Sequence, residues 1–202
     1  MGFHRTVSVA ITGASGAQYA LRLVEQLLAA DCRVYLMVSS AARVVINTET
    51  GIELPEAFGA QWDKWLKVFN CSREQLCMFS KEDWFSPVAS GSSSPSSLVI
   101  CPASGGTISA VAHGASNNLI ERAADVALKE RRQLILVPRE MPLSDVHLEN
   151  MLKLSRMGAV IMPASPGFYQ NPETVGDLVD FVVARILDQL GVAQKILPRW
   201  GE

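Results

Sequence analysis

Short apolar runs alternate along the chain with longer segments in which apolar residues recur every three or four positions. The short runs have the composition and length of buried β-strands, and they cover residues 6–12, 33–39, 97–101, 134–138 and 159–162. The longer segments have the period of amphipathic helices, and they cover residues 17–28, 40–49, 106–113, 118–131, 145–157 and 174–190. This alternation predicts an α/β fold, a Rossmann-like or flavodoxin-like open parallel sheet with helices on both faces.

The 202 residues, of which 49% are hydrophobic and 19% charged, provide enough apolar material for one domain with a filled core. We therefore expect a single domain over 1–202. Its last segment, about 191–202, continues past the final predicted helix and is too apolar to remain exposed to solvent. It must pack against its own sheet or against a neighbouring subunit. Residues 53–83 carry no pattern that assigns them to a helix or a strand.

Charge and residue spacing argue against several classes of function. Eighteen Lys and Arg residues against twenty Asp and Glu give a formal charge of -2, which offers no general attraction for nucleic acid or an anionic membrane. No apolar run approaches the roughly 20 residues of a membrane span, and the run 6–12 lacks the flanks of a signal peptide. We therefore expect a cytoplasmic protein. The cysteines and histidines lack the spacings of zinc sites and disulfide frameworks, so we expect no bound metal.

Two turns that contain glycine and serine follow predicted strands and enter predicted helices. In the first, Gly13 and Gly16 leave backbone N–H groups at a helix start, which either cradle a phosphate or let helix and strand pack closely. Its spacing is not that of a dinucleotide fingerprint, and Ser39 and Ser40 stand where NAD-binding folds place an acidic residue. The second turn spans 102–107. Two such turns at the carboxyl edge of a parallel sheet predict a mononucleotide in the crevice between them.

Charged residues on a predicted helix and at a strand end each allow two interpretations. Arg122, Asp125 and Lys129 share one face of the helix, as in a solvated charged face or in an anion site. Arg139 and Glu140 follow a strand at the ligand edge of the sheet, where they form either a salt bridge or a functional pair. Spacing alone does not decide between these alternatives.

Three further features are equally open. Arg185 falls at the border of the apolar arc of the helix 174–190, where its charge needs an anion, either Asp188 or a ligand phosphate. The serine-rich segment 86–97 is a flexible linker or a phosphate-binding loop. Several aromatic residues either pack or stabilise positive charge through their ring faces, namely Trp84, Phe168, Tyr169 and Trp200.

Taken together, several motifs between about residues 7 and 200 resemble the UbiX-like flavin prenyltransferases. They are Thr12-Gly13-Ala14-Ser15-Gly16-Ala17, Ala89-Ser90-Gly91-Ser92, Cys101-Pro102-Ala103-Ser104, Arg122-Ala123-Ala124-Asp125-Val126 with Lys129-Glu130-Arg131-Arg132, Val137-Pro138-Arg139-Glu140 and Pro166-Gly167-Phe168-Tyr169. This family uses reduced FMN and dimethylallyl phosphate to make prenylated FMN, the cofactor of UbiD-type decarboxylases. The resemblance thus implies an alkyl-transferring enzyme with FMN as cosubstrate and a UbiD-type decarboxylase as recipient of its product.

The resemblance also implies a role for each candidate residue. FMN would be held by Gly13, Ala14, Ser15, Ser39, Ser104, Gly105, Gly106, Thr107 and Arg139. The prenyl phosphate would be surrounded by Ser90, Gly91, Arg122, Lys129, Glu140, Tyr169 and Arg185. The catalytic residues would be Ser15, Glu49 and Glu140, which handle protons, and Trp84 and Trp200, which with Tyr169 stabilise an allyl cation.

The implied chemistry suits these residue types. Breaking an allylic C–O bond leaves a phosphate and an allyl cation, which require cationic side chains and aromatic faces respectively. New bonds at N5 and C6 of the flavin require the loss of a proton, and this explains the proton-handling groups. The chain has no Asp-Asp-x-x-Asp run to hold magnesium on a diphosphate, so we expect a metal-independent reaction.

The family assembles as dodecamers built from trimers, with FMN at subunit contacts. The resemblance therefore implies a homo-oligomer in which the arm at about 191–202 packs on a neighbouring subunit. Two other functions are alternatives. A flavin-dependent decarboxylase of the phosphopantothenoylcysteine type would need a catalytic histidine after the second strand, and none lies between His4 and His113. A non-catalytic FMN carrier would have no use for the cationic side chains.

Overall fold

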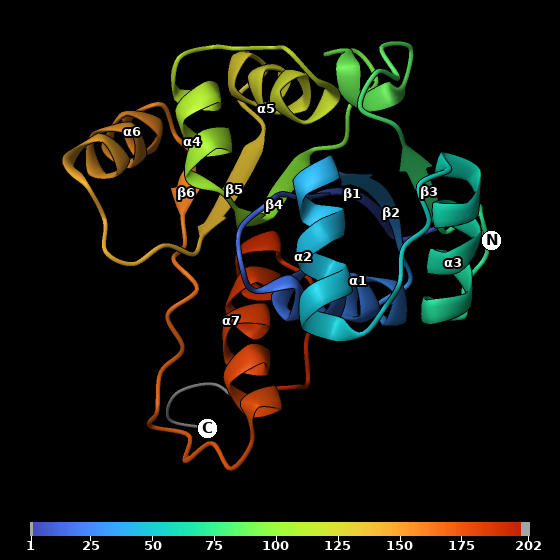
Figure 1. Cartoon of the computed structure of the whole chain (residues 1–202), viewed down its shortest axis with the longest axis vertical. Helices are drawn as coiled ribbons and strands as arrows, with labels where there is room; N and C mark the ends of the chain where they lie inside the picture. Colours follow the sequence, from blue (N-terminus) through green and yellow to red (C-terminus); the bar gives the residue numbers. More distant parts are fainter. Residues whose placement is uncertain (1, 199–202) are drawn as a thin grey trace.

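The computed structural model describes residues 2–198 and contains a six-stranded parallel sheet between two layers of helices (Figure 1). The strands are β1 (Arg5–Ile11), β2 (Cys32–Val38), β3 (Leu76–Phe79), β4 (Ser97–Ala103), β5 (Gln133–Pro138) and β6 (Val160–Ile161). Their order in the sheet is β3-β2-β1-β4-β5-β6. The order reverses between β1 and β4, and at such a point open parallel sheets bind ligands beyond the carboxyl ends of the strands.

The helices divide between the two faces of the sheet. They are α1 (Ala17–Ala29), α2 (Ser40–Thr50), α3 (Phe58–Phe69), α4 (Gly105–Ala112), α5 (Leu119–Lys129), α6 (Asp145–Arg156) and α7 (Val175–Leu190), with a short 3-10 helix at Pro87–Ala89. Buried side chains of α1, α2, α3 and α7 pack on one face. Those of α4, α5 and α6 pack on the other face. The predicted α/β fold is therefore confirmed.

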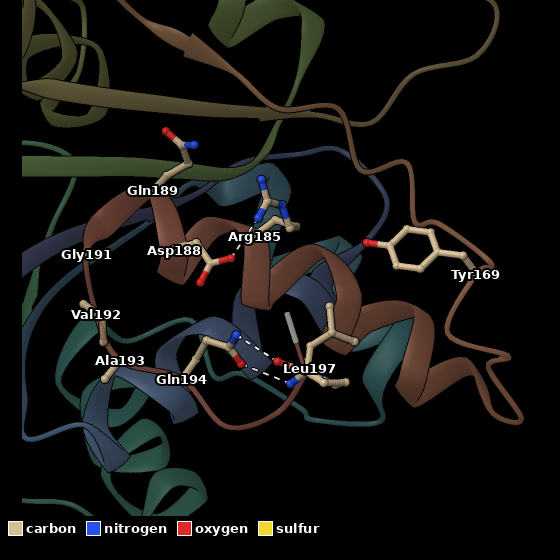
Figure 2. Close-up of a pocket in the computed structure, with 10 residues that line it drawn as sticks. Tyr169, Arg185, Asp188, Gln189, Gly191, Val192, Ala193, Gln194 and Leu197 are labelled. Carbon is tan, nitrogen blue, oxygen red and sulfur yellow. Dashed lines mark hydrogen bonds and ion pairs between the residues drawn. The ribbon is translucent and has the colours of Figure 1, made fainter. Parts of the chain in front are cut away.

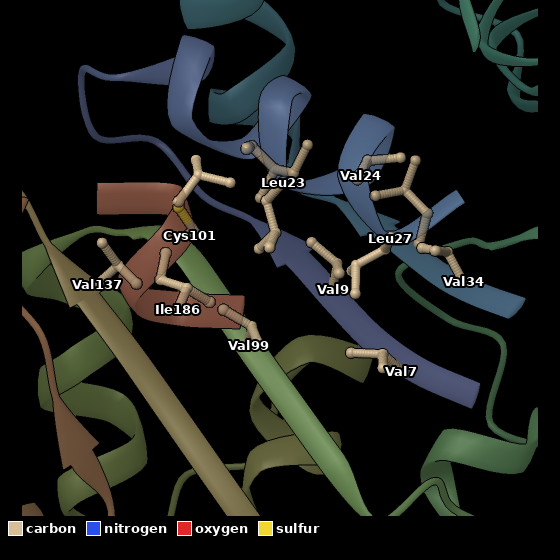
Figure 3. Packing of buried hydrophobic residues seen from close by; sticks show 14 of the residues in the cluster. Val7, Val9, Leu23, Val24, Leu27, Val34, Val99, Cys101, Val137 and Ile186 are labelled. Atoms are coloured by element: carbon tan, nitrogen blue, oxygen red, sulfur yellow. The ribbon is translucent and has the colours of Figure 1, made fainter. Parts of the chain in front are cut away.

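The alternating side chains of the central strands explain why both faces are covered. Val7 and Val9 of β1 point to the face with α1 and α7, whereas Ala10 points to the opposite cluster. Figure 3 shows Leu23 and Leu27 of α1 packed over these valines. Fully burying an aliphatic side chain of this size contributes roughly 1.5–3 kcal/mol, so these contacts fix α1 on the sheet.

The segment 53–83, which the sequence pattern left unassigned, contains α3 and β3. Helix α3 begins without a side-chain cap at Ala57, and only Trp65 in it is fully buried. Strand β3 has four residues at the edge of the sheet. Helix α3 therefore lacks a capping residue, and β3 is too short, for either to be recognised from a sequence pattern.

The C-terminal arm, as far as residue 198, makes contacts within its own chain, and its packing on a neighbouring subunit stays a prediction. Val192 and Ile196 pack against the core cluster of α1 and α7 in their own chain. The Gln194 side chain closes a turn here, since its Oε1 accepts the N–H groups of Ile196 and Leu197, each at 3.0 Å. These apolar side chains therefore cover the molecule's own core. Trp200 lies outside the described residues.

Across residues 2–198 the model has no helix with the length and apolar character that a bilayer crossing requires. The same residues bring together no group of three His, Cys, Asp or Glu side chains with the geometry of a metal site.

Candidate functional site

A buried threonine ties together the two strands at the point where the strand order reverses. The Thr12 hydroxyl donates to the carbonyl of Pro102 at 2.7 Å and accepts the N–H of Ser104 at 2.8 Å. The Thr12 N–H bonds the same carbonyl at 3.2 Å. These bonds set the two predicted turns, at 13–16 and 102–107, side by side at the carboxyl edge of the sheet.

The glycines of the first turn are required by close packing. A Cβ on Gly13 would lie 2.5 Å from the Cβ of Ala41 at the start of α2. Gly16 has a φ of +107°, which side-chain-bearing residues rarely adopt, and a Cβ there would lie 2.9 Å from the Tyr19 ring. Ser39 caps α2 by accepting the N–H of Ala42 at 3.0 Å. The first turn thus allows β1, α1 and α2 to converge closely.

The amino end of α1 is already paired with an anion from the same chain. The Glu49 carboxylate, at the end of α2, accepts the N–H groups of Gly16 and Ala17, each at 2.9 Å. Burial raises the pKa of Glu49, but the hydrogen bonds from the Ser15 hydroxyl and these N–H groups, with the charge of Arg139, outweigh burial and lower it. The predicted phosphate cradle at this helix start is therefore filled by a carboxylate.

The second turn keeps its donors available. Ser104 caps α4 by accepting the N–H of Thr107 at 3.3 Å, and the two hydroxyl oxygens lie 3.0 Å apart. Among residues 2–198 no acceptor bonds the N–H groups of Gly105 and Gly106, and a Cβ on Gly106 would have no neighbour within 4 Å. Free N–H groups and two hydroxyls at a helix start are the donor set for a phosphate.

Arg139 follows β5 and contacts the first turn. Its Nε donates to the carbonyl of Ser15 at 3.3 Å. The carboxylate of the next residue, Glu140, accepts the N–H of Met141 at 3.2 Å, and its side chain is exposed. Of the two interpretations of this pair, the salt bridge is not present among the described residues. The structure thus brings Ser15, Glu49 and Arg139 together at the first turn.

The serine-rich segment is fixed to α5 rather than free as a linker. Arg122 donates to the carbonyl of Ala89 at 3.1 Å, and Arg132 donates to the carbonyls of Gly91 and Pro95. A side chain on Gly91 would collide with the Glu130 carboxylate. The Ser90 and Ser92 hydroxyls lie 3.1 Å apart on the exposed side. The segment is therefore an ordered loop over α5.

The predicted phosphate-binding cations are each paired with an acid of their own chain. Arg122 pairs with Asp125 at 2.9 Å, and Lys129 pairs with Glu130. Arg185 pairs with Asp188 at 2.9 Å, which is one of the two partners expected for it. All three pairs are partly exposed, so a ligand phosphate can compete for each cation.

Arg185 and Tyr169 line one hollow of about 800 Å³ between α7 and the arm (Figure 2). The Tyr169 ring packs edge-on against Phe181, with ring centres 5.4 Å apart. The Arg185 guanidinium extends from α7 beside Asp188, and Gln194 and Leu197 form the far wall. Polar groups thus line a surface beside α7 that is open to a second molecule.

The expected substrate-binding residues do not form one site within the described chain. Arg122 and Lys129 lie on α5, on the face of the sheet opposite to α7, which carries Arg185. Among residues 2–198 no hydrogen bond or ion pair connects these two groups. Trp84 is 46% exposed and Trp200 lies outside the described residues. The described residues alone therefore do not bring together the aromatic rings expected to stabilise the allyl cation.

Comparison with known proteins identifies what this chain resembles. The profile of the family called Flavoprotein matches residues 2–187. The flavin prenyltransferase UbiX of Pseudomonas aeruginosa is 58% identical over 97% of this chain and 94% of that protein. Two solved structures are similar over 98% of this chain. One is AnUbiX (PadA1) in complex with FMN and dimethylallyl pyrophosphate, at 34% identity, TM-score 0.85 and 98% of that chain. The other is a dodecameric FMN-dependent UbiX-like decarboxylase of Escherichia coli O157:H7, at 37% identity, TM-score 0.84 and 100% of that chain.

Proposed function

This chain belongs to the UbiX-like flavin prenyltransferases of the Flavoprotein family, and we propose that it joins the dimethylallyl group of dimethylallyl phosphate to reduced FMN. The observation that carries this proposal is the pair of turns that follow β1 and β4 and border the predicted crevice, in a chain 58% identical to a flavin prenyltransferase along nearly its whole length. The flavin would supply the nucleophile, and bonds would form at its N5 and C6. The protein would supply binding, orientation and proton transfer.

The residues at the crevice fit FMN. The N–H groups of Gly105 and Gly106, with the hydroxyls of Ser104 and Thr107, suit the phosphate. Helix α1 is the less suitable place for the phosphate because the Glu49 carboxylate already bonds its first N–H groups. The remaining groups of the crevice would hold the rest of the cofactor, and they are Gly13, Ala14, Ser15, Ser39 and Arg139.

Ser15 and Glu49 form the proton-handling pair in this proposal. The hydrogen bond between them contributes to the lowered pKa of Glu49, which therefore carries a negative charge at neutral pH. An ionised carboxylate that bonds a hydroxyl can accept a proton through that hydroxyl. Glu140 is exposed beside the crevice and is the second candidate for proton transfer.

We propose that the prenyl-phosphate site is completed between copies of the chain in a homo-oligomer. Supporting this, α5 and α7 lie on opposite faces of the sheet, so Arg122 and Lys129 need a second copy to meet an Arg185 and Tyr169. A protein 37% identical to this chain forms a dodecamer, and we propose a dodecamer for this chain as well. The cations would stabilise the departing phosphate, and Trp84, Trp200 and Tyr169 would shield the carbon fragment.

The product would pass to a UbiD-type decarboxylase. We place this exchange in the cytoplasm because Cys32, Cys71, Cys77 and Cys101 are all free thiols, which a reducing compartment preserves. Of the alternatives, an oxidative decarboxylase would need a catalytic histidine after the second strand, and this chain has none there. An FMN carrier leaves the cations of α5 and α7 without a purpose.

The direct test is anaerobic incubation of the protein with reduced FMN and dimethylallyl phosphate, followed by mass spectrometry of the flavin. We expect the flavin mass to increase by one dimethylallyl unit, and no increase without the allylic phosphate. A parallel incubation with dimethylallyl diphosphate measures which phosphate is preferred. Unchanged FMN in the complete mixture, with FMN bound to the protein, would favour the carrier.

A further inference from the structure

Helix α6 begins with a reciprocal cap in which a histidine takes the position usual for a glutamate. The Ser144 hydroxyl accepts the N–H of His147 at 3.4 Å, and the Ser144 N–H donates to Nδ1 of His147 at 3.2 Å. In such capping boxes the third helical residue is ordinarily Glu or Gln. Helix α7 has an acid at the same position, and the Asp177 carboxylate accepts the N–H of Thr174 at 2.8 Å.

The cap determines which ring nitrogen of His147 carries a hydrogen. Nδ1 accepts the Ser144 N–H, so its lone pair is in use and the ring hydrogen belongs to Nε2. Nε2 is therefore a hydrogen-bond donor. It has no acceptor among residues 2–198.

The donor nitrogen lies against the second turn of the crevice. A Cβ built on Gly105 would lie 2.8 Å from Nε2 and 3.2 Å from Cδ2 of His147. Gly105 thus leaves the space that the ring edge occupies, because α4 and α6 pack together on the same face of the sheet. The Nε2–H consequently sits beside the free N–H groups at the start of α4.

Charge explains why this cap uses a histidine. A Glu or Asp at 147 would form the same cap but would place a carboxylate against the turn, where it would repel a phosphate. His147 closes the cap without a negative charge. We propose that His147 is an FMN-binding residue, whose Nε2–H donates to the phosphate at the start of α4. This inference rests on the proposed function, and specifically on FMN as the ligand of the second turn.

A matched set of variants tests the inference in the full-length protein. His147→Gln and His147→Glu both retain an acceptor for the Ser144 N–H and differ from each other in charge. Affinities for FMN and for riboflavin, which has no phosphate, are measured by flavin fluorescence titration. We expect His147→Glu to weaken FMN binding by about tenfold or more relative to His147→Gln, because it adds a repulsion to a lost donor. Riboflavin binding should be the same in the two variants.

A purely structural role would weaken both flavins equally, so a ratio of FMN to riboflavin affinity that stays at the wild-type value in His147→Glu would overturn the inference. Gly105→Ala gives a second approach in which His147 itself is not substituted. The new Cβ would displace the His147 ring, and the same selective loss of FMN affinity is expected. Should His147→Glu fail to fold, as judged by circular dichroism, the ratio in Gly105→Ala decides.

The proposed function can fail separately from this inference. A wild-type protein that binds FMN no more tightly than riboflavin would overturn both the phosphate position and the role of His147. A protein that shows the expected ratios but forms no prenylated flavin would leave the role of His147 in place and overturn the proposed reaction.

Discussion

At the scale of single residues, the proton transfer that we propose would depend on a contact between Ser15 and Glu49, two residues from distant parts of the sequence. Both residues are candidates for proton transfer by resemblance. Their mutual hydrogen bond, and the capping of α1 by Glu49, appear only in the folded chain. No local pattern connects residues separated by 34 positions, so the sequence alone predicts the residues but not their arrangement.

Replacing Ser15 by Ala should separate flavin binding from catalysis. The variant lacks the hydroxyl through which Glu49 would exchange a proton, whereas the backbone groups of the turn remain. We expect FMN affinity close to wild type and a rate of prenylated-flavin formation lower by about 10²–10⁴-fold, the usual contribution of positioned proton transfer. Single-turnover mass spectrometry measures the rate, and Ser15→Thr, which keeps a hydroxyl, is the control. A wild-type rate in Ser15→Ala would remove this residue from the proton path.

Glu49 should also influence stability in a pH-dependent way. Its pKa is lowered in the fold, so the ionised form stabilises the protein fully above the unfolded pKa, and this stabilisation is lost as the pH falls through the folded pKa. Glu49→Gln should therefore lower the free energy of unfolding by about 1 kcal/mol at neutral pH, a typical value for a helix cap. The difference from wild type should shrink in acid. Urea unfolding at neutral pH and at acidic pH measures this difference in stability, and an equal difference at both would contradict an electrostatic origin.

At the scale of elements, the sequence pattern predicts those segments whose side chains face a filled core. The five predicted strands and the helices around them correspond to observed elements with ends shifted by a few residues. The pattern does not predict β3, which is short and lies at the edge of the sheet, or α3, which begins at Ala57 without a side-chain cap. The interior tie at Thr12 is also missed, since a threonine at the end of a strand is too common to indicate a bond to the strand beside it.

Thr12 provides the prediction at this scale. Thr12→Val retains the size of the side chain but removes the hydroxyl, which leaves the Ser104 N–H without its acceptor, whereas the Pro102 carbonyl keeps the backbone N–H of residue 12. Leaving one buried polar group unpaired costs about 1–3 kcal/mol, so we expect a loss of this size in the free energy of unfolding. Urea unfolding measures this loss. Thr12→Ser keeps the hydroxyl and should lose less, and FMN affinity should follow the same order because the tie sets the second turn.

At the scale of the whole molecule, the sheet itself separates the residues that the resemblance assigns to one phosphate. Helix α5 packs on one face and α7 on the other, and each cation is neutralised by an acid of its own helix or its next residue. The sequence predicts the residue types of this site but not their division, because a position along the chain does not specify a face of the sheet. Truncating the arm is a poor test of sharing, since Val192 and Ile196 cover the chain's own core.

Complementation between two inactive variants tests sharing without disturbing that core. Lys129→Met and Arg185→Met should each bind FMN but transfer little prenyl group, because each removes one charge-assisted bond to the phosphate. In oligomers assembled from both variants, a site that draws α5 from one copy and α7 from another has intact cations in about a quarter of cases under random assembly. We therefore expect about a quarter of wild-type activity after co-expression. Co-expressed Lys129→Met and Arg122→Met, both on α5, should recover none, because every α5 then lacks a cation. If the first pair recovers no activity, one chain supplies Arg122, Lys129 and Arg185 to the same site, and the site is not shared between copies.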